Sequence, residues 1–175
     1  MKQQKLTFNN HKASNYKYPI SILADNITLT KNIGALFRLC DSLGVEHLYM
    51  AGNAATSPDS KLSKVSRFTE RSVAHSIEYD ALKTINQLKL NGYTIISLEL
   101  TTDSKNIRQF DFTTAEKICL ILGNEAKGVN DDLLEVSDYC IHIPMLGMNS
   151  SMNVICAASI AVFEMSRNLS QVKPS

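Results

Sequence analysis

Two consecutive apolar segments of this chain each run into a loop that contains glycine and polar side chains. The first, residues 117–122, continues into Gly123-Asn124-Glu125-Ala126-Lys127-Gly128. The second, residues 139–143, continues into Pro144-Met145-Leu146-Gly147 and then into Ser151-Met152-Asn153. Ligands bind at the carboxyl ends of the strands in an α/β sheet. The pair therefore favours an α/β fold in which the two loops form one cofactor site.

The rest of the chain alternates predicted strands and helices. Residues 53–64, rich in Ser, Ala and Asn, are expected to form a loop that has room for a short helix. Strands that alternate with helices indicate a mainly parallel sheet with helices on both faces. Hydrophobic spacing predicts further strands over 19–24, 47–50, 72–78 and 93–98, and helices over 31–43, 81–90, 131–136 and 151–168.

We expect a single domain, residues 19–170, with a basic arm before it, residues 1–18, and a short tail after it, residues 171–175. The arm has four lysines and no acid, hence a charge of +4, whereas the whole chain carries +1. A net charge of +1 argues against a protein that coats nucleic acid through charge alone. The arm is able to hold phosphates, and an ordinary solvated terminus is the alternative.

Several kinds of site are missing from the sequence. No G-x-G pair and no phosphate-binding P-loop occur, which excludes the dinucleotide fingerprint. The four cysteines and four histidines lack metal-ligand spacing. We therefore expect no metal, buried reduced thiols, and histidines that are structural or exposed. The longest apolar stretch, within residues 154–163, is too short for a bilayer, and no signal peptide is visible. We expect a cytoplasmic protein that does not bind membranes.

The last helix has an unusual surface, because residues 154–163 are apolar or small on all sides. A helix of this kind is buried on several sides. In a domain of this size, we expect one of its faces to contact a second subunit, which predicts a homodimer.

Helix 31–43 carries two candidate site residues. Arg38 points away from the apolar face of the helix, and Asn32 lies at its start, where free backbone N–H groups are able to bind phosphates or hydroxyls. A solvated arginine and an ordinary helix-start residue are the alternatives.

The two loops carry three more candidates. Glu125 lies between the glycines of the first loop, with a plain loop carboxylate as the alternative. Ser151 lies at the start of the last helix, where the alternative is a helix cap. Asn153 is harder to explain in this way, because an amide in the first turn of so apolar a helix needs partners if it is buried.

Together, these segments resemble the RNA ribose 2′-O-methyltransferases of the SPOUT superfamily, in its SpoU or TrmH-like branch. The family motif N-x-G-x-x-x-R matches Asn32 to Arg38, and G-x-E-x-x-G matches Gly123 to Gly128. The third motif, I-P-M-x-G-x-x-x-S-L-N-V, matches residues 143–154 with Met152 in place of Leu. The order and spacing of the motifs agree with the family, and the resemblance covers residues 20–168.

The resemblance implies an α/β domain with a C-terminal trefoil knot. It also implies S-adenosylmethionine bound inside the knot and an obligate dimer with the last helix at the interface. By position, the contacts to the cofactor are expected from Leu98, Glu99, Gly123, Asn124, Ile143, Met145, Ser151 and Met152.

The implied reaction is methyl transfer to a ribose 2′-hydroxyl of RNA, with Arg38 as the residue that activates the hydroxyl. Arginine is normally always charged, so two roles stay open. Arg38 acts as a base in an unusual environment or with help from an RNA phosphate, or it stabilises the developing alkoxide as a cation. Asn32, Glu125, Ser151 and Asn153 are expected to orient Arg38 and the ribose, across the dimer interface.

The sequence offers three arginines for holding RNA phosphates, Arg67, Arg71 and Arg167, with solvated surface charges as the alternative. Minimal members of the branch often act on transfer RNA, which makes tRNA the first choice of substrate and ribosomal RNA the second. Two other activities are weighed: a catalytically silent RNA-binding protein with the same fold, and a SPOUT enzyme that methylates a base. The complete set of motif residues argues against the silent alternative.

Overall fold

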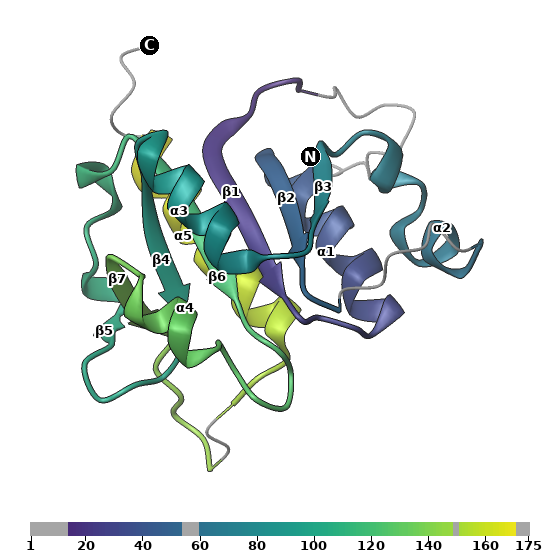
Figure 1. Cartoon of the computed structure of the whole chain (residues 1–175). Helices are drawn as coiled ribbons and strands as arrows, with labels where there is room; N and C mark the ends of the chain where they lie inside the picture. Colours follow the sequence, from purple (N-terminus) through teal and green to yellow (C-terminus); the bar gives the residue numbers. More distant parts are fainter. Residues whose placement is uncertain (1–13, 54–59, 149–150, 171–175) are drawn as a thin grey trace, which may run out of the picture.

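The computed structural model describes residues 14–53, 60–148 and 151–170. In this part of the chain, seven strands form one sheet in the order β3-β2-β1-β6-β4-β7-β5, and every neighbouring pair is parallel (Figure 1). The strands are β1 (Tyr18–Asp25), β2 (Val45–Ala51), β3 (His75–Glu78), β4 (Tyr93–Leu98), β5 (Lys105–Asn106), β6 (Lys117–Leu122) and β7 (Tyr139–His142). The helices are α1 (Thr30–Ser42), α2 (Ser60–Ser66), α3 (Ala81–Leu90), α4 (Asp131–Glu135) and α5 (Val154–Ser170), with 3₁₀ turns η2 (Thr69–Arg71), η3 (Ile107–Gln109) and η4 (Phe112–Thr114).

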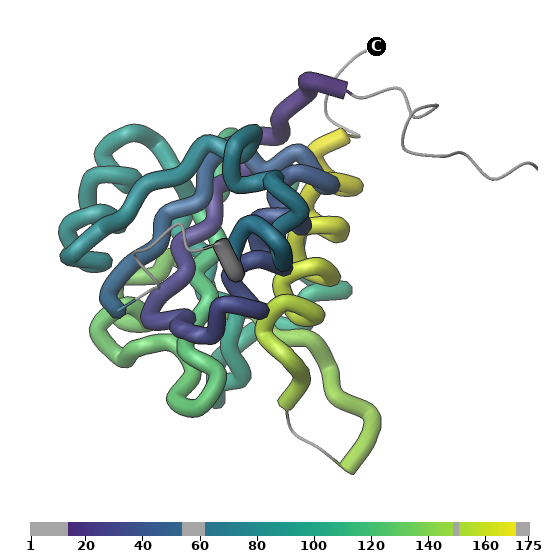
Figure 2. The backbone as a smooth tube through the Cα atoms, turned by 90° about the vertical axis from the view of Figure 1, so that its right-hand side faces the viewer, coloured from purple at the N-terminus to yellow at the C-terminus, as the bar shows by residue number. Residues whose placement is uncertain are grey.

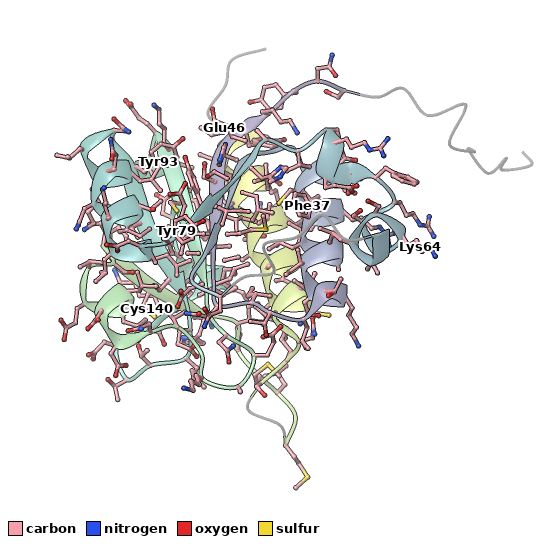
Figure 3. All side chains as sticks on the ribbon, turned by 45° about the vertical axis from the view of Figure 1, so that its right-hand side comes forward. Phe37, Glu46, Lys64, Tyr79, Tyr93 and Cys140 are labelled. Atoms are coloured by element: carbon pink, nitrogen blue, oxygen red, sulfur yellow. The ribbon has the colours of Figure 1, made fainter. Side chains whose placement is uncertain are left out.

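Helices cover both faces of the sheet. One face packs against α1 and α5 in a core that includes Ile22, Phe37 and Val162, and the other packs against α3 and α4 around Leu23 and Ile85. Figure 2 shows α1 and α5 side by side on one side of the molecule, and Figure 3 shows Phe37 pointing inward from α1. Strands buried on both faces are apolar along their whole length, which is why the sequence pattern identifies them. The predicted α/β class is confirmed.

The segment between β4 and β6 contains structure that the sequence pattern does not predict. It holds β5, η3 and η4. Asn106 caps η3 by accepting a hydrogen bond from the N–H of Arg108 at 3.0 Å, and Asp111 caps η4 by accepting one from the N–H of Thr113 at 2.9 Å. Elements this short have no hydrophobic period. β5 pairs with β7 and adds an edge strand to the sheet.

Several predicted boundaries differ in the structure; β2, for example, spans Val45–Ala51 rather than residues 47–50. β3 begins at His75 rather than at residue 72, because η2 precedes it and the N–H of Val73 bonds to the carbonyl of Thr69 at 3.0 Å. The short helix allowed for in the loop 53–64 exists as α2 and continues to Ser66.

The four cysteines differ in burial. Cys40 and Cys119 are buried, as expected, and burial raises the pKa of each thiol to about 12. For the other two the expectation is wrong, since Cys140 is half-buried on β7 and Cys156 is exposed on α5. Composition does not reveal which side of α5 faces the sheet, because residues 154–163 are apolar or small all round.

Parts of the sequence prediction fall outside the description. These parts are residues 1–13 of the basic arm, residues 54–59 of the predicted loop 53–64, residues 149–150 of the second loop and the tail 171–175. In the described ranges, no helix is long and apolar enough to cross a membrane. The same ranges contain no group of three or more His, Cys, Asp and Glu side chains that is placed to hold a metal ion.

Asp25, at the carboxyl end of β1, is 5 % exposed and accepts a hydrogen bond from Asn26 Nδ2 at 2.9 Å. Burial raises the pKa of its carboxyl group, and the bond to Asn26 offsets part of this rise. A carboxyl group with a raised folded-state pKa stabilises the fold while it is protonated, and this contribution is lost as the pH rises through that pKa.

We therefore expect Asp25→Asn to raise the melting temperature at neutral pH, and to raise it less as the pH falls towards the ordinary Asp value of about 3.9. Thermal unfolding followed by circular dichroism measures this, with Asp103→Asn at an exposed position as the control. A change in melting temperature that is the same at all pH values would contradict a buried, destabilising carboxylate.

Candidate active site

A cavity of about 790 Å³ lies at the carboxyl ends of β4, β6 and β7. Figure 1 shows these strand ends at the lower edge of the sheet. The start of α5 forms a further wall. The volume of the cavity is that of a typical small-molecule site. Glu125 and Asn153 of the predicted catalytic set line it. So do all eight residues predicted to bind the cofactor, namely Leu98, Glu99, Gly123, Asn124, Ile143, Met145, Ser151 and Met152.

The loop from Gly123 to Gly128, called the glycine loop below, folds back on itself. The N–H groups of Asn124 and Gly128 each donate to the other residue's carbonyl oxygen, at 2.9 and 2.8 Å. A Cβ on Gly123 would overlap the carbonyl carbon of Gly128, and Gly128 has a φ of +72°. Only glycine accepts both conditions without strain, so the two glycines are required for this closed shape.

Asn124 holds the glycine loop to the end of β1. Its Nδ2 donates to the carbonyl oxygen of Asn26 at 2.8 Å, while its Oδ1 accepts from the N–H groups of Ala126 and Lys127 at 2.9 and 3.2 Å. The side chain is thus part of the framework that shapes the cavity wall.

A chain of hydrogen bonds joins Glu125, Asn32 and Asn153. Asn32 is 3 % exposed at the start of α1. Its Nδ2 donates to Oε1 of Glu125 at 2.5 Å, and its Oδ1 accepts from Nδ2 of Asn153 at 3.4 Å. Three predicted catalytic residues from three separate motifs therefore meet at one wall of the cavity, where Glu125 and Asn153 line it and Asn32 lies buried behind them.

Asn153, rather than Ser151, caps α5. Its Oδ1 accepts from the N–H of Ile155 at 2.9 Å, and its carbonyl oxygen accepts from the N–H of Ala157 at 3.0 Å. This is the geometry of an N-cap. The predicted start of the helix at residue 151 is therefore wrong by three residues, and Ser151 lies exposed on the loop before it.

The structure does not bring Arg38 to this cavity. Its side chain is exposed, as the helical pattern predicts, and it lies about 9 Å further along the axis of α1 than Asn32. The lining of the cavity does not include it.

The three arginines proposed for RNA are exposed in different settings. Arg67 follows α2 directly, and Arg71 lies in η2. Both of these elements pack against α1. The guanidinium of Arg71 lies 4.8 Å from the ring centre of Phe68. Figure 3 shows Lys64 extending outward from α2 in the same region. Arg167 near the end of α5 is paired with Glu164, and hydrogen bonding to that carboxylate raises the pKa of Arg167.

Comparison with known proteins agrees with this geometry. The model of the SpoU rRNA methylase family matches residues 19–163. The chain belongs to this family. It is 31 % identical over 147 residues to a tRNA (guanosine(18)-2′-O)-methyltransferase of Aquifex aeolicus, an alignment that covers 83 % of this chain and 68 % of that protein. It is 30 % identical over 148 residues to a 23S rRNA (uridine(2479)-2′-O)-methyltransferase of Streptomyces viridochromogenes, with 83 % and 51 % covered.

Solved structures of SpoU proteins share the fold. The crystal structure of the TrmH/SpoU tRNA modifying enzyme of A. aeolicus superposes with a TM-score of 0.78 at 29 % identity, covering 90 % of this chain and 78 % of that one. The SpoU methyltransferase AviRb of S. viridochromogenes, solved in complex with AdoMet, gives a TM-score of 0.78 at 26 % identity, with 86 % and 60 % covered.

Sequence reasoning did not predict every cavity residue of this SpoU-family chain, and it assigned one of them, His142, another role. His142, expected to be structural or exposed, lines the cavity, and its Nδ1 lies 3.0 Å from Oγ of Ser104. Because that Oγ donates its own hydrogen to the carbonyl of Thr101 at 2.8 Å, it accepts from His142, so Nδ1 carries a hydrogen. His142 and Ser104 lie 38 residues apart in segments that share no motif, so no sequence signal joins them.

The closed glycine loop predicts a large effect for a single methyl group. Gly123→Ala should lower the free energy of unfolding by about 3 kcal/mol, because the new Cβ displaces backbone rather than a flexible side chain. Denaturant unfolding measures this. Gly147→Ala is the control, since its Cβ would meet nothing within 4 Å. Equal stability of the two variants would disprove the closure.

Proposed function

We propose that this chain transfers a methyl group from S-adenosylmethionine to a ribose 2′-hydroxyl of RNA, with tRNA as the favoured substrate. The observation that carries the proposal is that the glycine loop and the start of α5 line one cavity and that Asn32 joins them by hydrogen bonds. The names of the A. aeolicus relative, a tRNA ribose methyltransferase, and of the AdoMet complex of AviRb support it.

The residues of the cavity fit S-adenosylmethionine. Leu98, Ile143 and Val154 give the lining an apolar part. The bound cofactor supplies an activated methyl group, and the protein supplies position and electrostatics. The eight predicted residues would surround it, in the knotted arrangement that the family resemblance implies.

The polar chain is proposed to orient the ribose. Within the described residues, Oε1 of Glu125 bonds to Asn32, whereas its Oε2 has no hydrogen-bond partner. That oxygen is available to accept a hydrogen bond from a ribose hydroxyl. Asn32 and Asn153 would keep the carboxylate in place while the methyl group is transferred, which is catalysis by positioning.

Arg38 is proposed to stabilise the alkoxide that develops on the 2′-oxygen. A guanidinium is a permanent cation, and such a charge favours a transition state in which an oxygen becomes negative. Because Arg38 does not line the cavity of its own chain, we propose that it acts across a subunit interface. An RNA phosphate would then take the proton.

The outer face of α5 supports a homodimer. Cys156, Ile160 and Phe163 follow one another at helical spacing, and Ile160 and Phe163 are 43 % and 59 % exposed. We call these three residues the α5 stripe. An exposed apolar stripe of this kind marks an interaction surface, and a second copy of α5 is the occupant that we propose.

Contacts with RNA are proposed for Arg67 and Arg71, whose elements adjoin the helix of Arg38, and more weakly for Arg167, which already pairs with Glu164. An RNA substrate favours the cytoplasm, where tRNA and ribosomes are found. Ribosomal RNA is the second candidate substrate, because the S. viridochromogenes relative is named as a 23S rRNA enzyme.

Incubation of the protein with labelled S-adenosylmethionine and unmodified tRNA or rRNA transcripts tests the function. We expect label in the RNA, and nuclease P1 digestion with mass analysis should place the methyl group on ribose. Arg38→Ala should lower the transfer rate by about 100-fold or more, since one stabilising group at a developing oxyanion contributes that much. It should leave the affinity for the cofactor nearly unchanged.

Lys83→Ala, an exposed cation on α3, is the control and should keep full activity. A methyl group on the base would show a base methyltransferase instead. Cofactor binding without transfer to any unmodified RNA would show a silent RNA-binding protein. Full activity of Arg38→Ala would remove that residue from the mechanism.

Disruption of the α5 stripe tests the dimer. Phe163→Glu should convert the protein to a monomer by light scattering, because a carboxylate cannot be buried there without a partner. Cys156 should react slowly with a maleimide in the unmodified protein and rapidly in this variant. Leu90→Glu, at an 88 % exposed apolar position at the end of α3, is the charge-matched control. A native protein that is monomeric, with a rapidly reacting Cys156, would contradict this interface.

A further inference from the structure

Glu99 follows β4 directly, and both oxygens of its carboxylate accept backbone N–H groups. Oε1 accepts from Leu100 at 2.9 Å, and Oε2 accepts from Val129 at 3.0 Å. Leu100 is its neighbour in the chain, but Val129 lies immediately after the glycine loop. The carboxylate therefore connects the end of β4 to the far end of the loop.

The backbone of Glu99 is itself fixed. Its N–H donates to the carbonyl oxygen of Ile141 on β7 at 3.0 Å, and its carbonyl oxygen accepts from the Sγ of Cys140 at 3.4 Å. A side chain on so well-held a backbone is a rigid point from which to position another segment.

Gly128 and Glu99 occupy adjoining space. A Cβ on Gly128 would overlap Oε2 of Glu99. The glycine thus gives the carboxylate access to the N–H of Val129. The second glycine of the motif has two functions here, since it supplies the positive φ of the loop and leaves room for this oxygen.

The glycine loop is then held from both sides. Asn124 bonds to Asn26 on the β1 side, and Glu99 bonds to Val129 on the β4 side. Glu125 lies between these two attachments and reaches Asn32. Loss of the Glu99 attachment would leave the loop fixed only on the β1 side.

We propose that Glu99 is a positioning residue, which shapes the cofactor cavity by holding the glycine loop through the N–H of Val129. This inference rests on the proposed function, because it concerns how the same cavity binds S-adenosylmethionine. It differs from a direct contact between the carboxylate and the cofactor, which is what the family resemblance alone implies for this position.

A double-mutant cycle of Glu99→Ala and Gly128→Ala tests the proposal. Calorimetry gives the Kd for S-adenosylhomocysteine, the product form of the cofactor, and initial rates give KM for S-adenosylmethionine and for RNA. Glu99→Ala should raise the Kd and the cofactor KM by about 10-fold or more, since a hydrogen bond to a charged group contributes that much. KM for RNA should stay the same.

Gly128→Ala should weaken cofactor binding strongly in the normal background, where the new methyl meets the carboxylate. Its effect should be at least about threefold smaller in the Glu99→Ala background, because contacting residues couple. Glu99→Gln keeps one acceptor oxygen for two N–H groups. Its Kd for S-adenosylhomocysteine should lie between that of the normal protein and that of Glu99→Ala. Glu116→Ala, an exposed carboxylate before β6, is the control and should change nothing.

The outcomes are separable. Independent effects of the two substitutions on the Kd would overturn the positioning role and favour direct contact. An unchanged Kd in Glu99→Ala would overturn both roles. The melting temperatures of the same variants without cofactor give a second double-mutant cycle. This cycle shows whether Glu99 and Gly128 are coupled even if a variant binds the cofactor too weakly for calorimetry. Failure of the unmodified protein to bind either form of the cofactor would instead overturn the proposed function, and this inference with it.

Discussion

The position of β6 between β1 and β4 is the constraint on which the candidate site depends. The loop after β6 lies within hydrogen-bond reach of both neighbouring strand ends, so that Asn124 meets Asn26 on one side and Val129 meets Glu99 on the other. Because the strands are parallel, these ends share one edge of the sheet. A strand order that separated β6 from either neighbour would remove one of the two attachments and leave the cavity wall without a fixed shape.

The polar groups of the site are satisfied mainly by one another. Asn32 is nearly buried, and burying an amide without partners is costly; both of its side-chain ends bond to other site residues. The arginines lie apart from this network, on α1, near α2 and on α5. The chemistry is thus divided between a cofactor cavity rich in amides and carboxylates and a separate set of exposed cations suited to phosphates.

The sequence predicts those features that depend on local pattern. The strands and longer helices follow from hydrophobic spacing, and the eight residues that the family resemblance implies for cofactor binding all line the cavity. What it does not predict depends on tertiary distance or on very short elements. The bond from Asn124 to Asn26 joins residues 98 positions apart, and β5 has only two residues. The exposure of Cys156 depends on which side of α5 meets the sheet, and an all-apolar helix does not specify that side.

One helix, α5, connects the cofactor cavity with the proposed subunit interface. Asn153 joins the polar chain of the cavity to the first turn of the helix, and the α5 stripe lies on the outer side of the same helix. If a second copy packs on that stripe and shifts the first turn of α5, subunit association and cofactor binding become coupled. Thermodynamic reciprocity then requires that the cofactor strengthen subunit association by the same factor by which association strengthens cofactor binding.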